Sequence, residues 1–284
     1  MILITGANGQ LGTELRHLLD ERGIAYVAAD VAEMDITDAE KVTAFFAEVK
    51  PTVVYHCAAY TAVDAAEDEG KELNEKINVL GTENVAKAAA VHNAILVYIS
   101  TDYVFEGQKP AGLELEVDEP ANPQTEYGRA KRLGEEAVER LTNKFYTVRT
   151  AWVFGNYGKN FVFTMQNLAE TRDTLGVVND QFGRPTWTRT LAEFMVYLVD
   201  TKQDYGYYHL SNDSEKGITW YDFAKEILKD KNVTVNPVTS DQFPAKAKRP
   251  LNSTMSLAKA KATGFVIPTW QEALAAFYQQ EVKK

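Results

Sequence analysis

Apolar and amphipathic stretches alternate through the first half of the chain. Short apolar runs predict buried strands at 1–4, 24–29, 53–57, 95–99 and 145–148. Between them, apolar residues recur at helical spacing over 38–49, 72–92 and 126–141. This alternation is typical of a parallel sheet with helices on both faces. We therefore predict an α/β fold with a Rossmann-type, doubly wound parallel sheet.

The pattern changes after residue 149. The segments become more aromatic and alternate less regularly, although helices are still predicted over 188–201, 219–230 and 269–281. We expect a smaller, irregular C-terminal lobe over the carboxyl edge of the sheet, where ligands bind in open α/β sheets. The expected division is a dinucleotide-binding domain over 1–149, to which part of 174–200 returns, and a substrate-binding lobe mainly over 150–284.

Three glycines separate the first apolar run from the first amphipathic stretch. Gly6, Gly9 and Gly12 follow the spacing G-x-x-G-x-x-G, and leucines at helical spacing come next. In a dinucleotide-binding unit, such glycines permit a tight turn, close approach to a pyrophosphate and close helix packing. The second apolar run ends at Asp30, where a carboxylate meets the adenosine ribose in such folds. The same residues also fit a turn that holds no phosphate.

Composition and charge narrow the classes of function. The chain has 284 residues and a net charge of -10, with no basic run, so we expect no nucleic-acid or anionic-membrane partner. It has no apolar stretch of transmembrane length and no leader before the first strand, which predicts a cytoplasmic protein. Cys57 is the only cysteine, which excludes a disulfide framework and predicts a small buried side chain.

A tyrosine and a lysine stand four residues apart at the start of the predicted helix 126–141. Tyr127 and Lys131 therefore share one helical face. A nearby ammonium favours the phenolate and lowers the pKa of a tyrosine, which suits acid–base catalysis. Thr101, at the end of an earlier strand, has a hydroxyl that can bond the same substrate oxygen. A solvated tyrosine beside a surface lysine is the alternative interpretation of the pair.

Blocks of sequence spread over nearly the whole chain carry a resemblance to a known family. They lie at 5–12, 58–67, 100–105, 127–131, 149–155, 180–186 and 249–253. Through them the chain resembles the extended short-chain dehydrogenase/reductases. The Thr-Ala-Val-Asp run at 61–64 and the Ser-Thr-Asp-Tyr-Val-Phe run at 100–105 are most similar to the branch that acts on dTDP-4-dehydrorhamnose.

The resemblance implies reduction of dTDP-4-dehydrorhamnose to dTDP-L-rhamnose, with hydride from NADPH or NADH. Tyr127 would protonate the C4 oxygen, with Thr101 and Lys131 as the other catalytic residues, and Lys131 would hold the nicotinamide ribose. The pyrophosphate would lie on Gly9, Gln10 and Leu11, between Gly6 and Gly12. The remaining implied cofactor positions are Asp30 at the adenosine ribose, Asp35 and Ile36 near the adenine, and Ala58, Ala59 and Tyr60 along the cofactor path.

The resemblance also implies a set of substrate-binding residues. Trp152 would stack on the thymine ring, although by itself it also fits an ordinary core tryptophan. Val63, Asp102 and Tyr103 would border the sugar. Arg249 and Asn252 would reach the diphosphate or close the lobe.

Cofactor preference, metal and assembly stay open at this stage. Asp30 favours NADH, because a carboxylate repels a 2′-phosphate, yet family members use NADPH as well, so we expect both to work. Members can dimerise through a magnesium ion, and Glu14 stands in the matching region; an exposed helix carboxylate is the other interpretation. We expect a monomer or homodimer with a small-molecule substrate.

Two other functions fit parts of the pattern. A nucleotide-sugar epimerase or dehydratase shares the glycine turn and the Tyr-x-x-x-Lys pair. Dehydratases carry Thr-Asp-Glu where this chain has Thr101, Asp102 and Tyr103, and an epimerase would retain its cofactor through purification. A non-catalytic regulatory subunit, like that of methionine adenosyltransferase, resembles the same branch. Such a subunit would have no need of Thr101, Tyr127 and Lys131 together.

Overall fold

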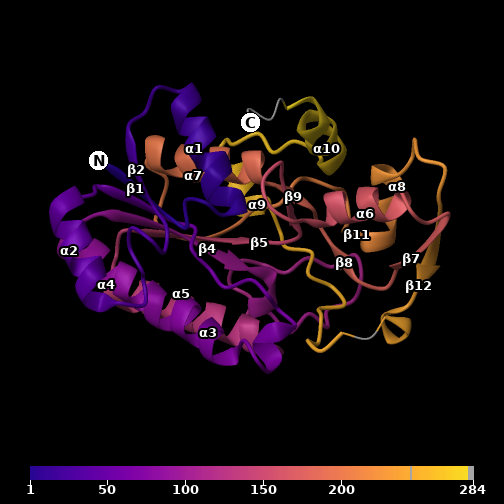
Figure 1. The fold of residues 1–284 in the computed structure, drawn as a ribbon, viewed down its shortest axis with the longest axis horizontal. Helices are drawn as coiled ribbons and strands as arrows, with labels where there is room; N and C mark the ends of the chain where they lie inside the picture. Colours follow the sequence, from indigo (N-terminus) through magenta and orange to yellow (C-terminus); the bar gives the residue numbers. More distant parts are fainter. Residues whose placement is uncertain (244, 281–284) are drawn as a thin grey trace.

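A six-stranded parallel sheet forms the centre of the molecule (Figure 1), which is a computed structural model describing residues 1–243 and 245–280. The strands, in their order across the sheet, are β10 (Gly206–His209), β5 (Phe145–Thr150), β4 (Ile95–Thr101), β3 (Val53–His56), β1 (Ile2–Thr5) and β2 (Tyr26–Ala29). The predicted Rossmann-type fold is confirmed, because all five pairings are parallel and the chain crosses over between them.

The strand ends define one edge of the sheet. Thr5 pairs with His56, and Thr101 pairs with Thr150, so the last residues of neighbouring strands lie side by side. Because the strands are parallel, every loop that follows a strand begins at this same edge. The predicted site residues at the ends of β1, β3 and β4 are thereby brought together.

Helices cover both faces of the sheet (Figure 1). On one face α1 (Gln10–Glu21) packs against α7 (Thr188–Asp200), and both contribute to a cluster that includes the fully buried Leu15 and Phe194. The other face carries α2 (Ala39–Val49), α4 (Thr82–Val91) and α5 (Glu126–Leu141), whose apolar side chains form a second cluster with Leu3 and Leu96. Burial of these two clusters fixes the doubly wound arrangement.

The predicted helix 72–92 contains a π-helical segment. The chain forms α3 (Lys71–Glu75), the π-helix η2 (Lys76–Gly81) and then α4 without a break. Gly134 of α5 packs so closely here that a Cβ would lie 2.7 Å from the Asn78 carbonyl oxygen. Hydrophobic spacing does not reveal a change from α to π turns, so this difference was not predicted.

The second lobe has its own apolar core. It contains β6 (Val153–Phe154), α6 (Phe161–Ala169), β7 (Thr174–Val178), β8 (Phe182–Gly183), β9 (Thr186–Trp187), β11 (Ile218–Thr219), α8 (Trp220–Ile227), β12 (Thr234–Val238) and α10 (Trp270–Gln279). Its core joins β6, α8 and α10 through residues such as Phe154, Phe223 and Phe277, and α6 adds Val162 and Met165. Three short two-stranded ribbons, β7–β12, β8–β11 and β6–β9, complete it.

The sheet receives one strand that the sequence did not predict. β10 pairs with β5, and α9 (Ala258–Ala262) packs beside it, so chain well beyond residue 149 returns to the sheet. β10 consists of Gly-Tyr-Tyr-His and lacks the aliphatic run of the other strands. The division at residue 149 stays a prediction. The predicted helix end at residue 281 and the lobe's residues 244 and 281–284 lie outside the described residues.

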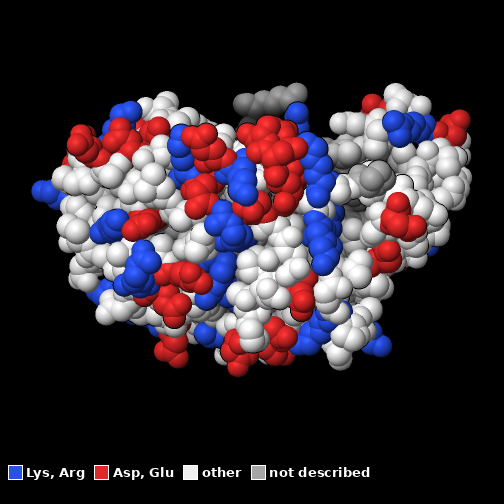
Figure 2. Space-filling view, turned by 90° about the horizontal axis from the view of Figure 1, so that it is seen from below, with Lys and Arg blue, Asp and Glu red and all other residues white. Residues whose placement is uncertain are grey.

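Charge is mixed over the outside of α4 and α5. Figure 2, seen from below, shows Lys and Arg side chains beside Asp and Glu, as in the pairs of Glu83 with Lys87 and Arg140. Within residues 1–243 and 245–280, no helix combines the length and apolar character that crossing a membrane requires.

Candidate active site

The glycine turn between β1 and α1 is closely packed. Gly6 has φ of 61°, and a Cβ there would lie 2.5 Å from the backbone nitrogen of Ala58. A Cβ on Gly12 would lie 2.2 Å from the Gly6 carbonyl oxygen. Both positions therefore require glycine. The turn ends at Gly9, the N-cap of α1, so the helix directs its first N–H groups, including those of Gln10 and Leu11, toward the carboxyl edge of the sheet.

The end of β3 lies against this turn. Ala58 packs on Gly6, and two residues later the backbone of Tyr60 is held by hydrogen bonds to Asn78. The Tyr60 N–H donates to Asn78 Oδ1 over 3.1 Å, and Asn78 Nδ2 donates to the Tyr60 carbonyl oxygen over 2.9 Å. The structure thus brings the predicted cofactor positions at the ends of β1 and β3 into direct contact.

Asp30 braces the turn from the end of β2. Its carboxylate accepts hydrogen bonds from the backbone N–H groups of Asn8, at 2.9 Å, and Val31, at 2.8 Å. An arginine that the sequence analysis did not consider lies nearby, because Arg16 Nη1 donates to Asn8 Oδ1 over 3.1 Å. The site where a ribose would lie is therefore flanked by an acid and a base.

Asp35 and Ile36 lie farther along the same edge. Asp35 accepts from the backbone and hydroxyl of Thr37, at 3.0 and 2.8 Å. Ile36 is buried against Gly81 of the π-helix, and Asn84 Nδ2 donates to its carbonyl oxygen over 2.9 Å. The predicted adenine positions therefore follow Asp30 along the chain, with Ile36 packed against the π-helix.

Thr101 ends β4, and Tyr127 and Lys131 lie one turn apart at the start of α5, with the Thr101 side chain close to Tyr127. The Thr101 hydroxyl donates to Asp102 Oδ1 over 2.9 Å and accepts from the Tyr103 N–H at 3.2 Å. Tyr127 is hydrogen-bonded to Thr101. Lys131 Nζ lies 4.2 Å from the centre of the Tyr98 ring. α5 starts correctly because the Thr125 hydroxyl caps it, accepting from the Gly128 N–H at 3.0 Å.

Burial controls the protonation of this group. Burial raises the pKa of Tyr127, although the Thr101 hydrogen bond lowers it. Burial lowers the pKa of Lys131 to about 7, against the opposing effect of Glu135. The expected lowering of the Tyr127 pKa by Lys131 is not found, since desolvation is the largest effect on Tyr127 and Lys131 is not among the groups that shift its pKa. The phenol stays protonated at neutral pH, which suits a proton donor.

A segment of the second lobe closes the sugar side of the site. Arg249 Nη1 donates to the Tyr103 hydroxyl over 2.9 Å, and its Nη2 pairs with Asp64 at 2.5 Å, next to Val63. Asp102 is buried, and burial raises its pKa to about 6, with an opposing hydrogen bond from Ser253. Arg249 of the second lobe thus contacts Tyr103 after β4 and Asp64, which is next to the predicted substrate position Val63.

Asn252 forms its hydrogen bonds with backbone groups of two loops. Its Nδ2 donates to the carbonyl oxygens of Pro110 and Leu113, each over 2.9 Å, and its Oδ1 accepts from the Thr254 N–H. The two bonds from Nδ2 hold the loop after β4. The contact of Asn252 with a diphosphate stays a prediction, and the amide is already fully bonded.

Trp152 lies two residues after β5 and is partly buried. Its φ is 49°, an uncommon conformation for a tryptophan. The Trp220 indole stacks on it with ring centres 3.7 Å apart and planes at 14°. A Cβ on Gly183 would lie 2.6 to 2.9 Å from three atoms of the Trp152 indole, which places Gly183 over a ring face. Trp220 and Gly183 therefore both lie in close contact with the Trp152 indole.

Glu14 is not the exposed helix carboxylate that one interpretation expected. It is fully buried in α1, and burial raises its pKa. Its Oε1 accepts from Gln280 Nε2 at 2.9 Å and lies 3.6 Å from Arg189 Nη1. The Arg189 guanidinium repels a cation, and the Gln280 amide presents N–H groups to Glu14 rather than an oxygen ligand. In the described part of the chain, no cluster of acidic, His or Cys residues is suited to a metal. The residues around Glu14 do not fit magnesium.

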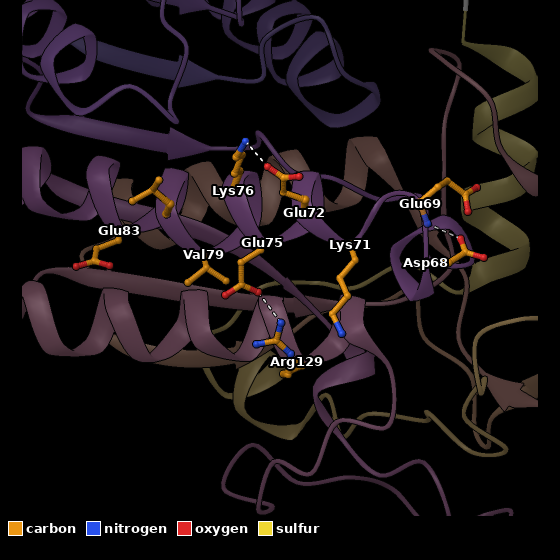
Figure 3. A pocket seen from close by; sticks show the side chains of 10 residues that line it. Asp68, Glu69, Lys71, Glu72, Glu75, Lys76, Val79, Glu83 and Arg129 are labelled. Carbon is orange, nitrogen blue, oxygen red and sulfur yellow. Dashed lines mark hydrogen bonds and ion pairs between the residues drawn. The ribbon is translucent and has the colours of Figure 1, made fainter.

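A surface groove of about 790 Å³ lies apart from these residues (Figure 3). It runs along α3, η2 and the start of α4, and Arg129 of α5 closes it. Two of its cations are paired within the groove, Lys76 with Glu72 at 2.7 Å and Arg129 with Glu75 at 2.5 Å. None of the predicted catalytic or cofactor positions lines it, so its volume does not mark the active site.

The roles of several polar residues were not predicted from the sequence. Asn74 Nδ2 donates to the Glu126 carbonyl oxygen over 3.0 Å and Asn78 Nδ2 to Asn74 Oδ1 over 2.8 Å, which joins the Tyr60 turn to the start of α5. Their spacing of four on an otherwise apolar helical face was a usable signal. Ser253 and Arg16 carried no such signal, because their roles depend on contacts made across the fold.

The sheet, the glycine turn and the lobe over the carboxyl edge define a reductase-type Rossmann protein of the extended short-chain dehydrogenase/reductase class. The family model described as the RmlD substrate binding domain matches residues 1–283. The chain belongs to this family, the dTDP-4-dehydrorhamnose reductases.

Individual relatives are similar to this chain over nearly their full length. The chain is 40% identical to the dTDP-4-dehydrorhamnose reductase of Aggregatibacter actinomycetemcomitans, with 96% of each chain covered. The crystal structure of the Clostridium acetobutylicum reductase has a TM-score of 0.93 and 43% identity, with 98% of each chain covered. That of the Bacillus anthracis enzyme in complex with NADP also has a TM-score of 0.93, with 40% identity and 99% of each chain covered.

Proposed function

We propose that this protein reduces dTDP-4-dehydrorhamnose to dTDP-L-rhamnose with NADPH or NADH. The observation that carries the proposal is that Thr101, at the end of β4, lies close to Tyr127 of α5, with the buried Lys131 one turn along α5 and near Cys57 after β3, in a chain of this family. A reductase needs a proton donor next to the site of a hydride donor. Dehydratases carry a glutamate directly after the strand-end Thr-Asp pair, and this chain has Tyr103 at that position.

Each side chain of the site has its own role in the proposed reduction. A bound reduced nicotinamide supplies the hydride to C4 of the sugar. Tyr127, kept protonated by burial, donates its proton to the C4 oxygen as negative charge develops there. Thr101 holds the Tyr127 hydroxyl, and Lys131 binds the nicotinamide ribose and in its charged form stabilises the phenolate that remains. Asp102 and Tyr103 border the sugar, and Arg249 supplies positive charge on the diphosphate side.

Both cofactors are accommodated through the pair of side chains around Asn8. Asp30 bonds ribose hydroxyls in NADH, and Arg16 offers a guanidinium to the 2′-phosphate of NADPH. Arg16→Gln is expected to raise KM for NADPH about tenfold and to leave KM for NADH unchanged, with Arg22→Gln at the end of α1 as the control. An equal effect on both cofactors would remove Arg16 from cofactor discrimination.

The activity itself is tested by mixing the enzyme with NADPH or NADH and dTDP-4-dehydrorhamnose. We expect loss of reduced nicotinamide only when all components are present, and dTDP-L-rhamnose as the product by chromatography against a standard. A sugar product formed without net oxidation of cofactor would indicate an epimerase. The cytoplasmic location and the monomeric or homodimeric state stay predictions.

A further inference from the structure

The indole of Trp220 occupies the position on Trp152 that a flat ligand ring requires. We propose that Trp220 is a positioning residue that fills the nucleobase subsite in the free enzyme and leaves it when a pyrimidine nucleotide binds. This inference rests on the proposed function, because that function assigns Trp152 to the base. Its new content is the role of Trp220.

The subsite has one rigid wall. Gly183 lies so close to the Trp152 indole that any side chain there would displace the ring, and Gly183 is fixed by its pairing with Ile218 in the β8–β11 ribbon. Trp152 itself follows Thr150, which pairs with Thr101 of the catalytic group. Gly183 therefore restricts movement of the Trp152 ring, and a ligand ring that stacks where Trp220 now lies has to displace Trp220.

The stacked ring has the geometry of a ligand. A centre-to-centre distance of 3.7 Å with planes at 14° is the arrangement of two fully overlapped flat rings. Protein aromatic pairs favour offset or edge-on contacts, as the other described ring pairs of this lobe mostly do. A thymine needs this same space, and both rings cannot occupy it together.

Trp220 is placed where it can move away. It is the first residue of α8, directly after the cap Thr219, and it is only partly buried. Its other described ring neighbour is Phe161, at 4.5 Å and tilted by 50°. Phe223 and Ile227 of the same helix belong to the buried core of the lobe, whereas Trp220 is a partly buried residue packed against that core.

Competition between the two rings gives a measurable signature. Two parallel indoles at this distance couple their excited states and give a paired signal in far-ultraviolet circular dichroism. We expect this signal to disappear as dTDP is added to the unaltered enzyme, with the same midpoint as dTDP binding measured by calorimetry. A signal that persists in the dTDP-saturated enzyme would overturn the role of Trp220 and leave the proposed function standing.

Variants give the second test. Trp220→Leu removes the competing ring, so dTDP is expected to bind about two- to tenfold more tightly, the range that one aromatic stack is worth. Tyr221→Leu, the neighbouring aromatic change in α8, is expected to leave dTDP affinity unchanged. Unchanged or weaker dTDP binding in Trp220→Leu contradicts the displacement. If dTDP fails to bind the unaltered enzyme while NADPH binds, the proposed function fails as well.

Discussion

Tyr127 shows how burial, more than a neighbouring charge, sets the chemistry of single residues in this protein. Lys131 stands one turn away on α5, yet it is itself buried and its pKa is lowered to about 7. Desolvation keeps Tyr127 a phenol, which is the form that a reduction consumes. The spacing of the two residues is visible in the sequence, but the depth of their burial is a property of the fold.

Replacing Tyr127 by Phe removes the proposed proton donor. We expect kcat to fall at least about a hundredfold, the usual scale for lost general-acid catalysis, while the Kd for NADPH stays unchanged. Tyr208→Phe is the matched control, since that buried hydroxyl bonds only the Asp204 carbonyl oxygen among its described partners. Steady-state kinetics and NADPH titration measure both variants. Near-normal turnover of Tyr127→Phe would contradict the assignment.

Asp102 predicts a pH dependence of stability. Its pKa rises from 3.8 to about 6 on folding, so between these values the folded protein binds a proton that the unfolded chain has lost. Stability from this group is present below pH 3.8 and is lost as the pH rises through 6, by at most about 3 kcal/mol. Urea unfolding across this range is expected to show the wild type losing stability relative to Asp102→Asn as the pH rises. Parallel curves would contradict the buried carboxyl.

Among the elements, the π-helix η2 connects the cofactor side of the site with the catalytic helix. Asn78 bonds Tyr60 after β3 and Asn74, which in turn bonds the first residue of α5. The helix 72–92 was predicted as one amphipathic element, and its existence was confirmed. Its π-helical segment and the inward-facing amides were not predicted, because a hydrophobic pattern reports which face is buried and not the hydrogen-bond register.

Asn78→Ala is expected to loosen the start of α5. We expect kcat to fall about ten- to a hundredfold through misplacement of Tyr127, with a loss of about 1–3 kcal/mol in unfolding free energy. Asn212→Ala is the control, because Asn212 is equally buried and holds the Trp187 N–H and the Pro268 carbonyl oxygen away from the site. It should lose similar stability and keep its kcat. Equal kcat in both variants would make Asn78 a purely structural residue.

At the scale of the whole molecule, contacts between the sheet and the lobe complete the site. Asn160 Nδ2 donates to Gln10 Oε1 over 3.1 Å, which ties the lobe to the glycine turn, and Arg249 joins Asp64. The sequence predicted most of the sheet and its helices, because those follow from local periodicity, and the assignment of the catalytic residues stays a prediction. It did not predict β10 or the Trp152–Trp220 stack, because both depend on residues far apart in the chain.

The Glu14 neighbourhood predicts the response to chelation. Arg189 pairs with Glu21 and Glu193 as well as Glu14, so positive charge is already supplied at this junction between α1 and α7. Treatment with EDTA is therefore expected to change neither kcat nor the sedimentation coefficient. A loss of activity restored by magnesium would show that the ion binds by other residues.

The central claim is that hydride passes from the cofactor to C4 of the sugar while Tyr127 supplies the proton. The direct measurement uses NADPH carrying deuterium at C4 of the nicotinamide, in the transferred position, with dTDP-4-dehydrorhamnose in ordinary water. NMR of the product is expected to show deuterium at C4 of a rhamnosyl unit and no deuterium elsewhere in the sugar. A product free of deuterium, or one labelled at another carbon, would contradict direct reduction at C4.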